Sequence, residues 1–62
     1  MNENQTALIE FVKSKEKVSL KECYAQFPTW SRDGMRGFIN ASNKAGLYFM
    51  RVGEGLYTYK PK

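Results

Sequence analysis

The sequence has no histidine, only one cysteine and two prolines, and no long hydrophobic run among its 62 residues. A single cysteine excludes a disulfide framework within the chain. Without histidine, a Cys/His zinc site is excluded too, because such a site needs about four ligands. No stretch approaches the roughly 20 apolar residues that span a bilayer, and the first residues lack the basic and apolar parts of a signal peptide. We therefore expect a cytoplasmic protein without metal, cofactor or membrane contact, in which Cys23 is reduced.

Residues suited to catalysis are scarce as well. There is no histidine to act as a base, and no pair of carboxylates falls on one side of a predicted helix. Cys23 lies on an apolar stripe, which favours an inert thiol. Ser19 and Ser31 have no base partner and suit helix caps. We expect no enzymatic activity and, in a chain this short, no enclosed pocket for a small-molecule ligand.

Positive charge is concentrated in the later part of the chain. Lysine and arginine number ten against six acidic residues, for a net charge of +4. Residues 1–16 hold two cations and three anions, whereas residues 17–62 hold eight cations and three anions. The 42% hydrophobic and 15% aromatic content favours a folded chain, and the length allows a single domain over residues 1–62. A basic surface of this kind suits a polyanion such as nucleic acid, although solubility alone also accounts for a charge of this size.

Two helices with a short strand between them are predicted in the first half of the chain. Apolar residues at helical spacing, preceded by Asn2 as a cap, predict a helix over about 4–14. A strand is expected at about 17–19. Ser19 and Glu22 form a capping-box pattern that opens a helix over about 20–26. Pro28 ends that helix, because the residue before proline avoids the helical conformation.

A third helix and a hairpin are predicted in the second half. Ser31 is a good N-cap, and Gly46 a good stop, for a helix over about 32–45. Its inward side is expected to carry Met35, Phe38, Ile39 and Ser42. Strand-forming residues predict a hairpin over about 47–60, whose turn contains Gly53 and Gly55, both able to adopt positive φ. Phe49, Tyr57 and Tyr59 are the expected core residues of the hairpin.

This order of elements resembles the winged helix-turn-helix family from end to end. Two stretches carry the likeness: residues 18–22 with the short helix and turn that follow, and residues 44–57, which look like the end of a recognition helix and its wing. The resemblance implies an α+β fold of three helices with a C-terminal β-hairpin wing. It also implies binding of double-stranded DNA, with the third helix in the major groove. A small transcriptional regulator, like those of phages or bacteria, is the expected role.

The outward side of the third helix supplies most of the candidate DNA contacts. Arg36 suits guanine and Asn40 suits adenine, each through two hydrogen bonds. Arg32, Asn43 and Lys44 suit phosphates. Gly37 would let the backbone approach DNA closely. The remaining candidates flank this helix or lie on the wing and near the second helix: Ser31, Arg51, Lys17 and Lys21.

Three alternatives stay open from the sequence. The polar side of the third helix would also suit solvent. Gly34–Gly37 has the GxxG form of the RNA-clamping loop in KH domains, although the residues before it do not match. Tyr48, Met50 and Leu56 would form an exposed apolar patch if they point away from the core, and this patch would serve a homodimer or another protein partner.

Overall fold

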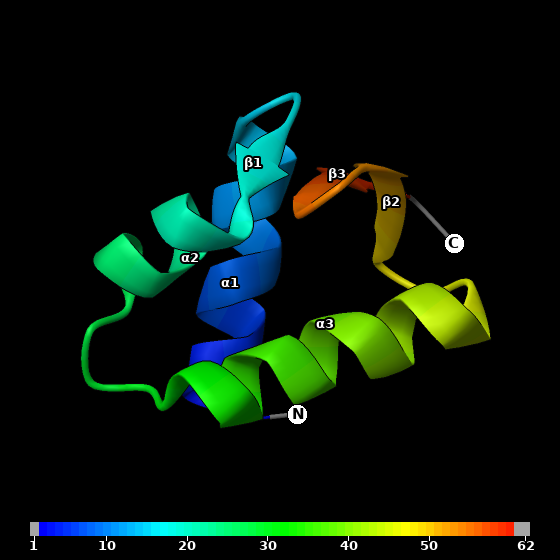
Figure 1. Ribbon diagram of the computed structural model, residues 1–62. Coiled ribbons are helices and arrows are strands. Elements are labelled where there is room, and N and C mark those ends of the chain that lie inside the picture. Colours follow the sequence, from blue (N-terminus) through cyan, green and yellow to red (C-terminus); the bar gives the residue numbers. More distant parts are fainter. Residues whose placement is uncertain (1, 61–62) are drawn as a thin grey trace.

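Three helices precede a β-hairpin in the computed structural model, which describes residues 2–60. The elements are α1 (Glu3–Ser14), β1 (Val18–Ser19), α2 (Leu20–Gln26), α3 (Arg32–Ala45), β2 (Phe49–Gly53) and β3 (Leu56–Tyr59). The sheet is antiparallel with the strand order β1-β3-β2. In Figure 1, α3 runs along the bottom of the view, and the hairpin rises from its end. The fold is therefore of the expected α+β class, with the layout of a winged helix.

Side-chain caps set the starts of the first two helices. Asn2 Oδ1 accepts a hydrogen bond from the Gln5 backbone N–H at 2.8 Å, and Gln5 Oε1 accepts one from the Asn2 N–H at 3.2 Å. Ser19 and Glu22 form the same reciprocal box at the start of α2. Such boxes satisfy amide groups that a helix leaves free. Helix α1 starts one residue earlier than predicted, and α2 has the predicted bounds.

Helix α3 also has the predicted bounds, and its two ends show why. Ser31 Oγ accepts a hydrogen bond from the Gly34 N–H at 3.1 Å. At the other end Gly46 adopts φ 70°, the left-handed conformation that ends many helices. Gly34 and Gly37 both lie inside this continuous helix. The KH-type alternative is therefore wrong, because it needs these glycines in a loop.

Every element except the turns contributes to the core. The buried apolar residues are Leu8, Val12, Val18, Cys23, Met35, Ile39, Phe49 and Tyr57. The expected burial of Phe49 and Tyr57 is confirmed. Tyr59 is half-buried, and the Lys13 ammonium of α1 lies 5.7 Å from the centre of its ring. Helix α1 thus packs along β3, and α3 closes the other side of the core.

A chain of aromatic rings connects α1, the turn after α2, α3 and β2. The ring centroids of Phe11 and Phe27 are 5.9 Å apart, and those of Phe27 and Trp30 are 6.4 Å apart. Trp30 continues to Phe38 at 6.0 Å, and Phe38 to Phe49 at 5.9 Å. Three of these four contacts are edge-to-face, a favourable geometry for aromatic pairs. The chain holds the start of α3 against the rest of the molecule.

The hairpin differs from its prediction in two respects. The strands occupy 49–53 and 56–59 rather than most of 47–60, because the chain between α3 and β2 bends at residues 47 and 48. Only Gly55 adopts positive φ, at 67°, and Gly53 does not. Gly53 instead ends β2 opposite Leu56, after a shift in register between Arg51 and Gly53. The extra residue in β2 sets the geometry of the turn, so one left-handed glycine suffices.

The two glycines within α3 are expected to respond differently to alanine. A Cβ at Gly34 would lie 2.9 Å from Ser31 Oγ and 3.0 Å from Trp30 Nε1, whereas a Cβ at Gly37 would meet nothing within 4 Å. Glycine costs about 1 kcal/mol relative to alanine inside a helix. We expect Gly37→Ala to raise the free energy of unfolding by about 0.5–1 kcal/mol in urea denaturation. Gly34→Ala should lack this gain, because the new methyl group disturbs the Ser31 cap. Equal gains in both variants would contradict the close packing at Gly34.

Candidate nucleic-acid interface

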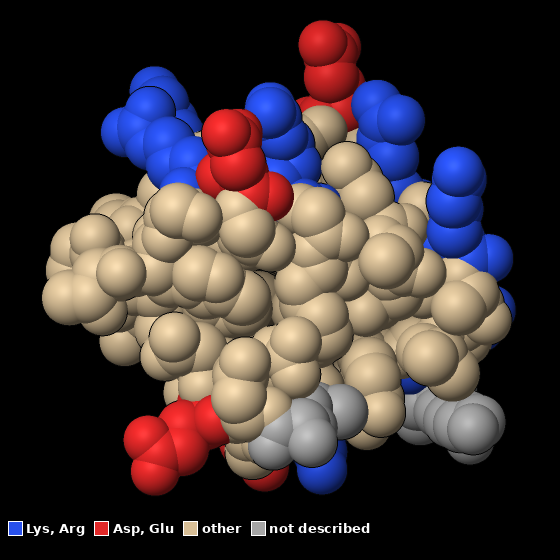
Figure 2. Space-filling view, turned by 90° about the horizontal axis from the view of Figure 1, so that it is seen from below, with Lys and Arg blue, Asp and Glu red and all other residues tan. Residues whose placement is uncertain are grey.

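Helix α3 has one buried side and one exposed polar side. Met35, Ile39 and Ser42 are buried. Of the residues expected on the outward side, Arg32, Arg36, Gly37, Asn40 and Lys44 are exposed, as is Asp33, whereas Asn43 is half-buried. Figure 2 views the molecule from below, and most of the lysine and arginine side chains that it shows lie along the upper and right edges, with acidic side chains among them. The basic residues therefore form a band rather than one continuous patch on this face.

Arg36 lies in the middle of α3 and has an acidic neighbour. Its Nη2 atom is 3.3 Å from Asp33 Oδ1, and the two side chains are 57% and 93% exposed. An ion pair this exposed contributes about 0–1 kcal/mol. An incoming phosphate or base would therefore displace Asp33 at little cost, although the carboxylate reduces the positive charge around Arg36.

Two asparagines one helical turn apart join α3 to the hairpin. The Tyr57 hydroxyl of β3 donates to Asn40 Oδ1 at 3.1 Å. The Arg51 backbone N–H of β2 donates to Asn43 Oδ1, also at 3.1 Å. The sequence predicted both asparagines as DNA contacts and missed this second role. The one signal for it was that Tyr57, predicted to be buried, needs an acceptor for its hydroxyl.

Asn43 also covers part of an unpaired strand edge. Because the strand order is β1-β3-β2, one side of β2 has no neighbouring strand among residues 2–60. Asn43 accepts the Arg51 N–H on that side, which hinders pairing with a strand of another chain. The Arg51 side chain is exposed, and its Nε donates to the Gly53 carbonyl at 3.2 Å. The arginine therefore follows the strand toward the tip of the wing, where Glu54 is exposed.

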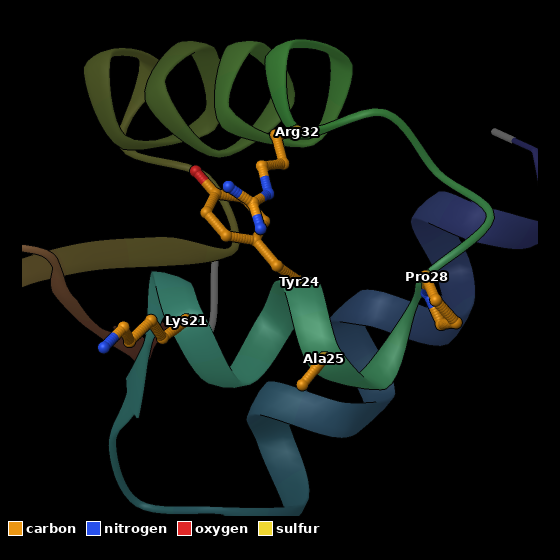
Figure 3. A pocket seen from close by; sticks show the side chains of 5 residues that line it. All are labelled: Lys21, Tyr24, Ala25, Pro28 and Arg32. Atoms are coloured by element: carbon orange, nitrogen blue, oxygen red, sulfur yellow. The ribbon is translucent and has the colours of Figure 1, made fainter.

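A hollow lies between α2 and the start of α3. It has a volume of about 410 Å³ and is lined by Lys21, Tyr24, Ala25, Pro28 and Arg32. Figure 3 shows Arg32 reaching from α3 onto the ring of Tyr24, which rises from α2. The guanidinium carbon is 5.3 Å from the ring centre, within the range of a cation–π contact. The ring orients the guanidinium group beside the hollow.

The acidic residues near this hollow are engaged elsewhere. Glu22 caps Ser19, and its other oxygen lies 4.0 Å from Lys15 Nζ. Asp33 pairs with Arg36. Within residues 2–60, neither Lys21 nor Arg32 is in an ion pair. The hollow therefore combines two cations without an acidic partner, which suits a phosphate group.

The other predicted contacts fall into two groups. Ser31 and Lys44 lie at the two ends of α3, and the Ser31 hydroxyl oxygen already serves as the N-cap. Lys17 lies in the loop between α1 and β1, which Figure 1 places at the end of the molecule away from α3. The structure therefore separates Lys17 from the candidates on α3. Lys62, counted among the cations of residues 17–62, lies outside the described residues.

The exposed apolar residues of the hairpin differ from those predicted. Met50 is 42% and Leu56 38% exposed, as expected, and Val52 joins them at 45%. Tyr48 is half-buried, with its ring 6.4 Å from that of Phe49. It precedes β2, so the alternation of the strand does not direct it outward. Three aliphatic side chains, not Tyr48, form the exposed apolar surface of the wing.

Cys23 is the single thiol of the chain, and its surroundings keep it protonated. It is buried in α2. Burial raises the pKa of the thiol from 9.0 to about 11, with a smaller contribution from the negative charge of Glu22. Within the described residues, no three His, Cys, Asp or Glu side chains are grouped to hold a metal ion. No helix within residues 2–60 is long and apolar enough to cross a membrane.

Comparison with protein-family models, with curated proteins and with solved structures finds no match for this chain. Its function is therefore inferred from the geometry and charge of the surface described above.

Removal of the Asn43 amide should loosen the wing. Asn43→Ala leaves the Arg51 N–H without its acceptor. We expect a loss of about 0.5–1.5 kcal/mol of unfolding free energy and faster hydrogen exchange of the Arg51 amide. Asn4→Ala, an exposed change in α1, is the control and should alter neither. An unchanged exchange rate at Arg51 would argue against the anchoring role.

Cys23 should react slowly with alkylating reagents while the protein is folded. At pH 8 a thiol with a pKa of about 11 is almost entirely protonated, and only the thiolate attacks. We expect iodoacetamide to modify the folded protein far more slowly than the urea-unfolded chain. Because folding raises this pKa, stability should fall as the pH rises from about 9 to 11, and Cys23→Ala should reduce that slope. Equal labelling of folded and unfolded protein would contradict the burial.

Proposed function

We propose that the protein binds double-stranded DNA, with α3 in the major groove and the wing against the neighbouring backbone. The observation that carries this proposal is the outward side of α3, where Arg32, Arg36, Asn40 and Lys44 are exposed along one regular helix. A helix of 14 residues is about 21 Å long, and the major groove admits a helix. The fold holds this side clear of the core.

The contacts divide into those that read bases and those that position the helix. Arg36 and Asn40, in the middle of α3, face the base edges in this arrangement. Arg32 and Lys21 hold a backbone phosphate at the hollow between α2 and α3, where no acidic side chain of residues 2–60 pairs with either cation. Lys44 and Arg51 contact phosphates near the other end of α3. Gly37 allows close approach of the helix, since no atom fills the space beside it.

The proposed biological role is regulation of transcription in the cytoplasm by occupation of a DNA site. One winged-helix module makes few base contacts. Useful affinity therefore requires either two copies on neighbouring half-sites or several adjacent sites.

A second candidate function is supported by the aliphatic surface of the wing. Met50, Val52 and Leu56 are each more than a third exposed. Exposed apolar groups of this kind mark protein-interaction surfaces when they are contiguous. In this alternative the hairpin binds a protein partner, and the cations of α3 contribute only solubility.

Titration of a fluorescent random duplex over a range of salt concentrations tests the DNA proposal. We expect affinity to fall steeply with salt, with a slope of about 0.9 per phosphate contacted. Arg32→Ala should weaken binding to all sequences and reduce the slope by about one contact. Lys13→Ala removes the same charge from α1, beside Tyr59, and should change binding little.

The same titration separates the two candidate functions. No binding at low salt would reject the DNA proposal and leave the Met50, Val52 and Leu56 surface as the place to seek a partner. Equal weakening by Arg32→Ala and Lys13→Ala would mean that attraction is set by net charge and not by the α2–α3 hollow.

A further inference from the structure

The hydrogen bond between Tyr57 and Asn40 connects the core to the side of α3 that faces DNA in the proposed function. Tyr57 is 5% exposed and belongs to the buried core cluster. Its hydroxyl donates to Asn40 Oδ1 at 3.1 Å. Because packing fixes the ring, it also fixes the position of the hydroxyl group. The direction of the Asn40 amide is therefore set from inside the fold.

From this contact we infer that Tyr57 determines which base Asn40 recognises, an inference that rests on the proposed DNA-binding function. To bind adenine through two hydrogen bonds, asparagine must turn both Oδ1 and Nδ2 toward the base. Tyr57 holds Oδ1 toward the sheet, which leaves the Nδ2 hydrogens as the outward group. A base edge that offers acceptors then fits better, and guanine offers two in the major groove, N7 and O6. Asn40 favours guanine and disfavours adenine.

The neighbouring side chains also present mainly hydrogen-bond donors on this surface. Asn43 Oδ1 is occupied by the Arg51 N–H, so its amide also presents hydrogens. Arg36, Lys44 and Arg51 are exposed and have no acceptor atoms in their side chains. Asp33, already paired with Arg36, and Glu54, exposed at the tip of the wing, are exceptions. A surface composed mainly of donors complements acceptors, which are phosphates and guanine edges.

The test is selection of preferred sites from a random duplex library with the wild-type protein and three variants. Asn40→Ala identifies the base position that Asn40 reads, because the preference there disappears. At that position we expect the wild type to favour guanine over adenine about tenfold. Tyr57→Phe releases the amide, so the preference should shift toward adenine by about tenfold at that position alone. Tyr59→Phe removes a hydroxyl from the same strand beside Lys13, and should leave the preference unchanged.

The possible results separate the role of Tyr57 from DNA binding itself. Selection of adenine by the wild type, or an unchanged preference in a folded Tyr57→Phe, overturns the role of Tyr57 while leaving DNA binding intact. Absence of any duplex binding by the wild type overturns the proposed function and this inference with it. If circular dichroism shows that Tyr57→Phe is unfolded, Asn40→Asp replaces it. Asp still accepts from Tyr57 but has no amide hydrogens, so the guanine preference should vanish, and its persistence would overturn the inference.

Discussion

Helix α3 is held by contacts near its start and in its second half that leave Arg32, Arg36 and Lys44 exposed, and the rest of the structure depends on this arrangement. At its start, Trp30 and Phe38 continue the ring contacts that reach from Phe11 to Phe49. Toward its end, Asn40 and Asn43 accept hydrogen bonds from the hairpin. A chain of 62 residues buries only a small core. Contacts along one helix therefore present a defined surface with few residues.

Local pairing decides where the positive charge is effective. The net charge of +4 says nothing of its distribution. Asp33 partly neutralises Arg36 in the middle of α3, whereas the capping role of Glu22 keeps its carboxylate turned toward Ser19 and Lys15. At the hollow, Lys21 and Arg32 have no ion-pair partner in the part of the chain that the structure describes. The proposed phosphate contact at this hollow and the proposed base contacts of α3 thus have different electrostatic surroundings, although all lie along one surface.

The hydrogen bonds of Asn40 and Asn43 give the hairpin a role beyond that of a second contact with DNA. The pairing of Tyr57 with Asn40 orients a side chain on the helix, and the pairing of Asn43 with Arg51 protects a strand edge. If α3 recognises bases as proposed, the hairpin contributes to that recognition by orienting Asn40 from the side of the helix that faces the core. Mutations in the hairpin and in α3 are then expected to be coupled and not additive.

Local signals in the sequence determined the helices, because each cap joins residues only three positions apart. The start of α2 is set by Ser19 with Glu22, and the start of α3 by Ser31 with Gly34. Gly46 sets the end of α3. None of these signals depends on the rest of the chain. Helical spacing likewise separated the two sides of α3. The tertiary structure alone decided the contacts between side chains that lie far apart in the sequence. The partner of Asn40 is 17 residues away. Tyr48 is half-buried and not exposed, and Arg32 contacts Tyr24 on another helix. Hydrogen bonds and ring contacts across such separations depend on the packing of whole elements, which no local spacing encodes.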